Sequence, residues 1–212
     1  MKSTLQTVRA LAALTIIGTS AAQAAIIFDN FGPGDATAPG GRLVQGPDVG
    51  TIGDVDQAVK IRIGASPVFL TMVTMAVSSI QGSDGILVIG IRSDAAGSPG
   101  ALLFGGVVPG MALPTVSTSP KMLLSANTDY WFSIDATDTF DGSWAFNSTG
   151  DQGITAGRTN GNPWNVRPIE DRYAIRLEGR FVNPVPEPSS MLQLGGGAIA
   201  LIVLARKWRL AR

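Results

Sequence analysis

The sequence predicts an all-β protein, folded as an antiparallel two-sheet sandwich of jelly-roll-like form, on three observations. Apolar residues run in short blocks, and some blocks alternate with polar residues as half-buried strands do. The chain has 26 glycines and 13 prolines, and many of them form turn signals between these blocks. Residues 25–183 show no apolar pattern of a helix of normal length. Many short strands joined by tight turns are typical of a sandwich.

Residues 1–24 predict a secretory signal peptide, which would form an N-terminal signal helix. Lys2 and Arg9 come first, residues 10–17 are apolar, and Ala22-Gln23-Ala24 has the small residues of a cleavage site. The apolar stretch is too short to span a membrane as an ordinary helix. We therefore expect an exported protein whose mature chain begins near Ala25.

Residues 25–183 form the predicted ectodomain. Residues 59–63 and 175–181 alternate between apolar and polar side chains, which indicates strands with one buried face. Residues 68–77 and 86–91 are more continuously apolar and suit the centre of the core, and residues 101–108 and 129–134 are further candidates. The turn signals between strands are Gly32-Pro33-Gly34, Pro39-Gly40-Gly41, residues 82–85, Pro99-Gly100, Asp141-Gly142 and Asn160-Gly161.

The composition excludes several classes of function. The chain has 212 residues with sixteen basic and sixteen acidic side chains, but six of the basic ones lie near the two ends. The body keeps ten basic against fifteen acidic residues, which is unsuitable for binding nucleic acid. The chain has no Cys and no His, which excludes Cys nucleophiles, Ser-His-Asp triads and most zinc sites. We expect neither an enzyme nor a cofactor.

Three tryptophans of the body are candidates for stacking on sugar rings. Trp131 lies inside an aromatic run and Trp144 alternates with Phe146, so both are expected in the core. Trp164 lies in a loop that follows a turn signal, and it is the best ligand candidate. The predicted carbohydrate site consists of Trp164, Asn160, Asn162 and Arg158.

The acidic residues suggest two further kinds of site, a calcium site and a catalytic pair. Asp54 and Asp56 alternate, and other aspartates flank one loop, namely Asp135, Asp138, Asp141 and Asp151. Calcium binds carboxylate and carbonyl oxygens, so a structural calcium remains open, although the spacing does not match an EF-hand and aspartate is common in turns. A pair of aspartates could also hydrolyse a glycan. Among fifteen acidic residues some pair must lie close by chance, so this signal carries little weight.

The C-terminal end divides into three segments. Residues 184–190 predict an extended linker, because Pro184, Pro186 and Pro188 cannot donate to a sheet. Residues 191–205 carry no charge and predict a short transmembrane helix, although fifteen helical residues cover only about 22 Å of a ~30 Å hydrocarbon core. Residues 206–212 form a basic tail that favours the cytoplasmic side and contains Arg206, Lys207, Arg209 and Arg212. A permanent anchor remains open, but the glycine-bearing span after Pro-Glu-Pro fits a processed signal better.

This end resembles the PEP-CTERM sorting signal of Gram-negative, exopolysaccharide-producing bacteria. The residues that carry the likeness are Val185, Pro186, Glu187 and Pro188, followed by the apolar segment and the basic tail. The resemblance implies that an exosortase, a membrane-embedded sorting enzyme, recognises the end of the chain and processes it near the Pro-Glu-Pro step. It also implies transient anchoring in the inner membrane and a final place at the envelope surface or in the extracellular matrix, as in biofilms.

The body resembles the "choice-of-anchor" ectodomains, most closely the R type. The likeness rests on residues 28–31, residues 92–103, Tyr130-Trp131, residues 144–151, Asn160-Gly161 and Trp164. It implies an extracellular β-sandwich and transfers no catalytic residue. We therefore expect an exported, non-enzymatic surface or matrix protein, structural or adhesive in exopolysaccharide. The first alternative is a carbohydrate-binding module that uses Trp164, and the second is a glycan-acting enzyme.

Overall fold

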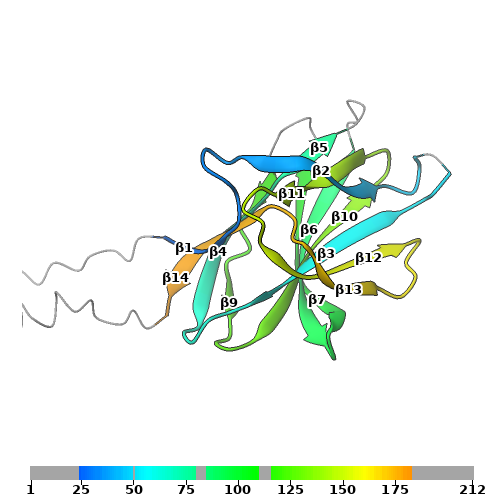
Figure 1. Ribbon diagram of the computed structural model, residues 1–212. Helices are drawn as coiled ribbons and strands as arrows, with labels where there is room; N and C mark the ends of the chain where they lie inside the picture. The colour runs from blue at the N-terminus through cyan, green and yellow to red at the C-terminus, as the bar shows by residue number, and fades with distance from the viewer. Residues whose placement is uncertain (1–23, 50, 80–84, 110–115, 183–212) are drawn as a thin grey trace, which may run out of the picture.

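The computed structural model describes residues 24–49, 51–79, 85–109 and 116–182, which form β-strands and their connections (Figure 1). The predicted all-β class is therefore confirmed for these residues. They contain no helix with the length and hydrophobicity of a membrane span. The predicted signal helix, the linker with the Pro-Glu-Pro step, the transmembrane segment and the basic tail lie outside the described residues.

The smaller sheet joins the first and last strands of the domain. β1 (Ala25–Asp29) pairs with β14 (Ile175–Phe181), and β14 pairs with β4 (Val68–Met75). Two short strands, β8 (Val116–Thr118) and β9 (Met122–Leu124), both pair with β4. All of these pairings are antiparallel, and Figure 1 shows β1 and β14 side by side.

The larger sheet has a branched order. Its main path runs through β5 (Val77–Ser79), β11 (Asp141–Asn147), β2 (Thr37–Gln45), β3 (Val55–Arg62), β10 (Asp129–Thr137), β6 (Ile86–Ala95) and β7 (Ser98–Pro109). β12 (Gln152–Thr159) pairs with β3, and β13 (Asn165–Asp171) pairs with β12. β2 meets β3 at the single pair Gln45–Val55. Val55 thus pairs with β2 on one side and with Thr159 of β12 on the other.

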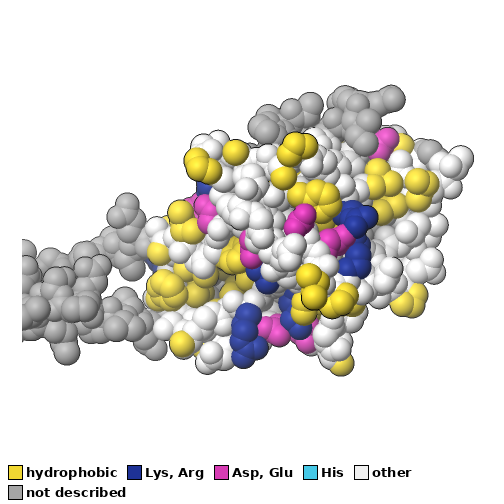
Figure 2. Space-filling view, in the orientation of Figure 1, with side chains coloured by type: hydrophobic (Ala, Val, Ile, Leu, Met, Phe, Trp, Pro, Cys, Tyr) yellow, Lys and Arg dark blue, Asp and Glu magenta, His cyan; other side chains and the backbone are white. Residues whose placement is uncertain are grey.

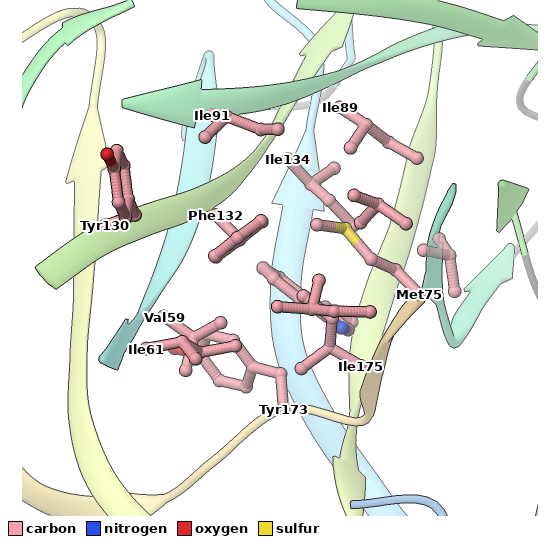
Figure 3. Close-up of a cluster of buried hydrophobic side chains, with 14 of the residues drawn as sticks. Val59, Ile61, Met75, Ile89, Ile91, Tyr130, Phe132, Ile134, Tyr173 and Ile175 are labelled. Carbon is pink, nitrogen blue, oxygen red and sulfur yellow. The ribbon is translucent and has the colours of Figure 1, made fainter. Parts of the chain in front are cut away.

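The two sheets pack across one apolar core (Figure 3). Met75 and Ile175 of the smaller sheet lie near Phe132 and Ile134 of the larger one, and all four side chains are almost fully buried. Burial of each large apolar side chain contributes about 1.5–3 kcal/mol relative to exposure. Alternation within the strands places these residues inward, so the predicted two-sheet sandwich is confirmed in this coarse form.

The predicted strands are all present, but three predicted turns are wrong. Pro39-Gly40-Gly41 lies within β2, Pro99-Gly100 within β7, and Asp141-Gly142 begins β11. At Pro39-Gly40-Gly41 the glycine serves close packing and not a turn. A Cβ atom at Gly41 would lie 2.3 Å from the backbone oxygen of Trp144. Glycine in these strands permits close approach of a neighbouring strand. The predicted turn at Asn160-Gly161 is present, with positive φ angles of 53° and 68°.

Candidate functional site

The outer face of the larger sheet carries a second, smaller hydrophobic cluster. Trp131 of β10, Ala58 of β3 and Ala156 of β12 are fully buried there, apart from the main core. Trp164 and Val166, which are half-buried, pack over them. The register places Ala58 opposite both Ser133 and Ala156, so these strands present one continuous face. The expected burial of Trp131 and Trp144 is confirmed.

Trp131 is held in place by charged neighbours. Its indole nitrogen donates to Asp94 Oδ1 at 2.8 Å, and the Lys60 ammonium lies 5.9 Å from its ring centre. Lys60 also pairs with Asp94 at 3.1 Å and with Asp129 at 3.2 Å. Burial works to raise the pKa of Asp94, but hydrogen bonds from Trp131 and Gly97 and the charge of Lys60 hold it below its usual value. Trp131 is thus a structural residue.

Trp164, the predicted sugar-stacking residue, lies against two arginines. The guanidinium carbon of Arg158 is 4.6 Å from the ring centre, and that of Arg92 is 5.6 Å from it. Arg158 donates to Asp56 at 2.6 Å, and Arg92 donates to Asp135 at 2.8 Å. Cation–π contacts of this kind contribute about 0.5–2 kcal/mol. Arg158 and Arg92 therefore already cover part of the Trp164 ring on which a sugar would stack.

Asp56 is an unusual carboxyl group, because its side chain is only 2% exposed. Burial is the main cause that raises its pKa to about 7; the charge of Asp135 adds to the rise and Arg158 opposes it. Burial also raises the pKa of Asp54. One carboxyl oxygen on each of Asp54, Asp56 and Asp135 is buried without a hydrogen-bond partner. A protonated carboxyl tolerates such a position better than a charged one.

Two of the aspartates that the sequence offered as calcium ligands are paired with arginines. Within the described ranges, no three acidic side chains are grouped so that they could hold a metal ion. Asp151, one of the loop aspartates, instead accepts two hydrogen bonds from Arg172 at 3.0 and 3.1 Å. Asp135 is paired with Arg92 on the outer face. These two carboxylates therefore form ion pairs within the protein.

The four predicted carbohydrate residues are only partly brought together. Arg158 and Trp164 touch, as described above. Asn160 is used locally, because its Oδ1 accepts from the Asp54 amide at 3.0 Å and ties the turn to the segment before β3. Asn162 is exposed and lies in a groove that Arg158 also lines. The loop that sequence reasoning singled out therefore lies beside a surface that it did not identify.

We name this surface the polar groove. It is an open depression of about 580 Å³ that is lined by β2, by β3 and by the β12–β13 hairpin. Figure 2 shows basic side chains, with acidic ones beside them, in this region. The lining residues are Gly41, Arg42, Leu43, Val55, Gln57, Gly157, Arg158, Thr159, Asn162, Pro163, Asn165 and Arg167. These residues come from four separate segments, so no local sequence signal marks the groove.

Gln57 fixes the floor of the polar groove. Its Nε2 donates to the Leu43 carbonyl at 2.8 Å, and its Oε1 accepts from Tyr173 and Arg167, each at 3.0 Å. Burial raises the pKa of Tyr173, so its hydroxyl remains a donor at neutral pH. Gly157 leaves room for this arrangement, because a Cβ atom there would lie 2.3 Å from Arg167 Nη2. Three hydrogen bonds therefore hold the Gln57 side chain in the floor.

Glu170 lies behind the groove and binds two of its arginines. Arg42 pairs with its Oε1, and Arg167 Nη1 donates to its Oε2 at 3.0 Å. Thr155 also donates to this carboxylate. Burial works to raise the pKa of Glu170, but Thr155 and the two arginines outweigh it and hold the pKa below its usual value. Glu170 thus stays charged and orients both guanidinium groups.

A second groove of about 480 Å³ lies where β6, β7 and β10 meet the segment before β10. Arg62, Asp94, Asp129 and Tyr130 are among its lining residues. Its two carboxylates are bound to Lys60, and Arg62 pairs with Asp129 at 3.3 Å. Its lining thus carries charges of both signs.

Comparison of the chain with protein-family models, with curated proteins and with solved structures gives no match.

Proposed function

We propose that this chain is an exported, non-enzymatic protein of the cell surface or extracellular matrix, structural or adhesive in exopolysaccharide. The observation that carries the proposal is the open polar groove on a β-sandwich, because amide, hydroxyl and guanidinium groups on an open surface suit a polymer. The signal peptide expected in residues 1–24 supports export. The absence of Cys and His throughout the sequence supports a non-enzymatic role.

The sorting route belongs to the same proposal. Val185, Pro186, Glu187 and Pro188, the apolar residues 191–205 and the basic residues 206–212 support recognition by an exosortase-type enzyme. The protein then passes through a transient inner-membrane stage, with the short C-terminal helix in the bilayer and the ectodomain outside. We also propose that the strands of the ectodomain follow a jelly-roll-like topology.

Mass spectrometry of the surface protein tests the sorting route. In Gram-negative cells that contain the sorting enzyme, we expect a mature chain without residues 1–24 and 191–212. Deletion of the sorting enzyme should leave the C-terminal segment in place and keep the protein in the membrane fraction. An intact C-terminus on surface protein from normal cells would instead make the tail a permanent anchor.

Carbohydrate binding through Trp164 is the second candidate function. It is favoured by the contact between Trp164 and Arg158, because Arg158 reaches both the outer face and the polar groove. The two arginines beside the ring leave less of it free for a sugar. The polar groove and the outer face can be separated by substitution, because Arg42 lines the groove and Trp164 does not.

A further inference from the structure

We propose that the polar groove binds a polysaccharide that carries carboxylate groups, such as a chain of uronic acid residues. Arg42 and Arg167 would face the carboxylates, and the exposed Asn162 and Asn165 would bind sugar hydroxyls. This inference rests on the proposed matrix function and names the ligand class for it.

The charges of the groove select an anion. Its lining holds three arginines and no acidic side chain. Arg42 and Arg167 share the single carboxylate of Glu170, so one positive charge remains in excess at this pair. The ectodomain as a whole carries more acidic than basic residues, which makes this basic surface a local exception. Arginine binds carboxylates through two parallel hydrogen bonds, which gives both affinity and direction.

The arginines of the groove are held in place before a ligand arrives. Arg167 is fixed by Glu170 and by Gln57, and Gln57 is itself fixed by Tyr173 and Leu43. Arg158 also lines the groove, but its guanidinium is held by Asp56 and Trp164 on the outer face, so Arg42 and Arg167 carry the proposal. Ordering these long side chains in advance lowers the entropic cost of binding. Arg42 is the most accessible, with 45% of its side chain exposed.

The shape of the groove suits a length of polymer. It is open to solvent, and its volume of about 580 Å³ lies within the ~300–1,000 Å³ typical of ligand sites. Exposed amides from Asn162 and Asn165 lie along the hairpin side, and Arg42 lies on the β2 side. The lining of the second groove includes two carboxylates, Asp94 and Asp129, which would repel an anionic polymer. We therefore assign the ligand to the polar groove.

Binding of polygalacturonate to the full-length chain in detergent, measured by calorimetry, tests the inference. We expect binding to polygalacturonate and at least tenfold weaker binding to the same polymer after methyl esterification, because esterification removes the charge and keeps the sugar. Equal binding to both polymers would overturn the carboxylate assignment. Inorganic phosphate at millimolar concentration should displace little polymer, and complete displacement would show a general anion site and contradict the proposal.

Matched substitutions locate the site. Arg42→Gln should weaken binding about tenfold and leave the thermal midpoint nearly unchanged, because Glu170 keeps Arg167 and Thr155 as partners. Asn162→Trp should block the groove from an exposed loop position. Arg62→Gln is the control, since Arg62 is 64% exposed and lines the second groove. An equal loss in Arg42→Gln and Arg62→Gln would reduce the interaction to non-specific charge.

Two further outcomes are decisive. Loss of binding in Trp164→Phe, with Arg42→Gln and Asn162→Trp unaffected, would move the sugar to the outer face and overturn the groove assignment. Absence of polymer binding altogether would overturn the inference, whereas the proposed sorting and surface function is judged separately by the mass of the mature protein.

Discussion

The buried carboxyl group of Asp56 links a single residue to the pH dependence of the whole fold. Its pKa is about 7 in the folded protein against an ordinary value of 3.8, with burial as the main cause. Between these values the folded state binds more protons than the unfolded state, so the free energy of unfolding falls as pH rises from about 4 to about 7. Asp94 and Glu170 have lowered pKa values, so their contribution is lost only at lower pH.

We therefore predict that the wild-type protein is more stable near pH 5 than near pH 8. Urea denaturation at several pH values measures this, and Asp56→Asn should flatten the curve between pH 5 and pH 8, because asparagine keeps an acceptor for Arg158 and has no proton to lose. Asp48→Asn, at an exposed position, is the control and should leave the slope unchanged. A wild-type curve that is flat from pH 5 to pH 8 would contradict this role of Asp56.

The sequence was a better guide to single candidate residues, such as Trp164, than to the residues that contact them in the folded protein. Trp164 and Arg158 flank one turn, so their proximity could be predicted from the loop itself. Arg92, which also lies against Trp164, is on a strand more than sixty residues away, and Gln57 and Arg42 reach the groove from other strands. Such contacts depend on strand pairing, for which a single sequence contains no local signal.

At the scale of the element, alternation predicted strands well and glycine predicted turns less well. The β14 pattern of Ile175 and Leu177 inward with Arg176 and Glu178 less buried is the pattern expected of a half-buried strand. Glycine has two uses that a sequence does not distinguish, namely turns and close backbone contact. Gly41 has the second use, because β2 meets the Trp144 backbone there.

We predict that Gly41→Ala lowers the free energy of unfolding by about 1–3 kcal/mol, because the new methyl group would force β2 and β11 apart. Gly105→Ala is the matched control. Gly105 is exposed in β7, and a Cβ atom there would make ordinary contacts of 3.5 Å. That variant should be neutral or slightly stabilised, since alanine restricts the unfolded chain. Equal urea midpoints for the two variants would show that β2 has room at Gly41.

At the scale of the whole molecule, the two-sheet class could be predicted but the order of the strands could not. Composition and short strands indicate a sandwich whatever the pairing. The pairing of β1 with β14 joins segments about 150 residues apart, and the lining of the polar groove comes from β2, β3 and the β12–β13 hairpin. The candidate binding surface is thus a consequence of topology, which explains why the sequence indicated only its Arg158 and Asn162 edge.

The β1–β14 pairing gives a direct test of this topology, because Ile26 lies opposite Glu178. Directly opposed Cβ atoms in antiparallel strands are about 4.5–5.5 Å apart, close to the separation that a disulfide needs. The chain has no cysteine, so Ile26→Cys with Glu178→Cys allows a single intramolecular bond. We predict that the oxidised double variant gains about 2–4 kcal/mol over its reduced form in urea denaturation, because the bond closes a long loop in the unfolded chain. Ile26→Cys alone should show no such dependence on reductant. If the folded double variant kept two free thiols under oxidising conditions, the register between the first and last strands would be wrong.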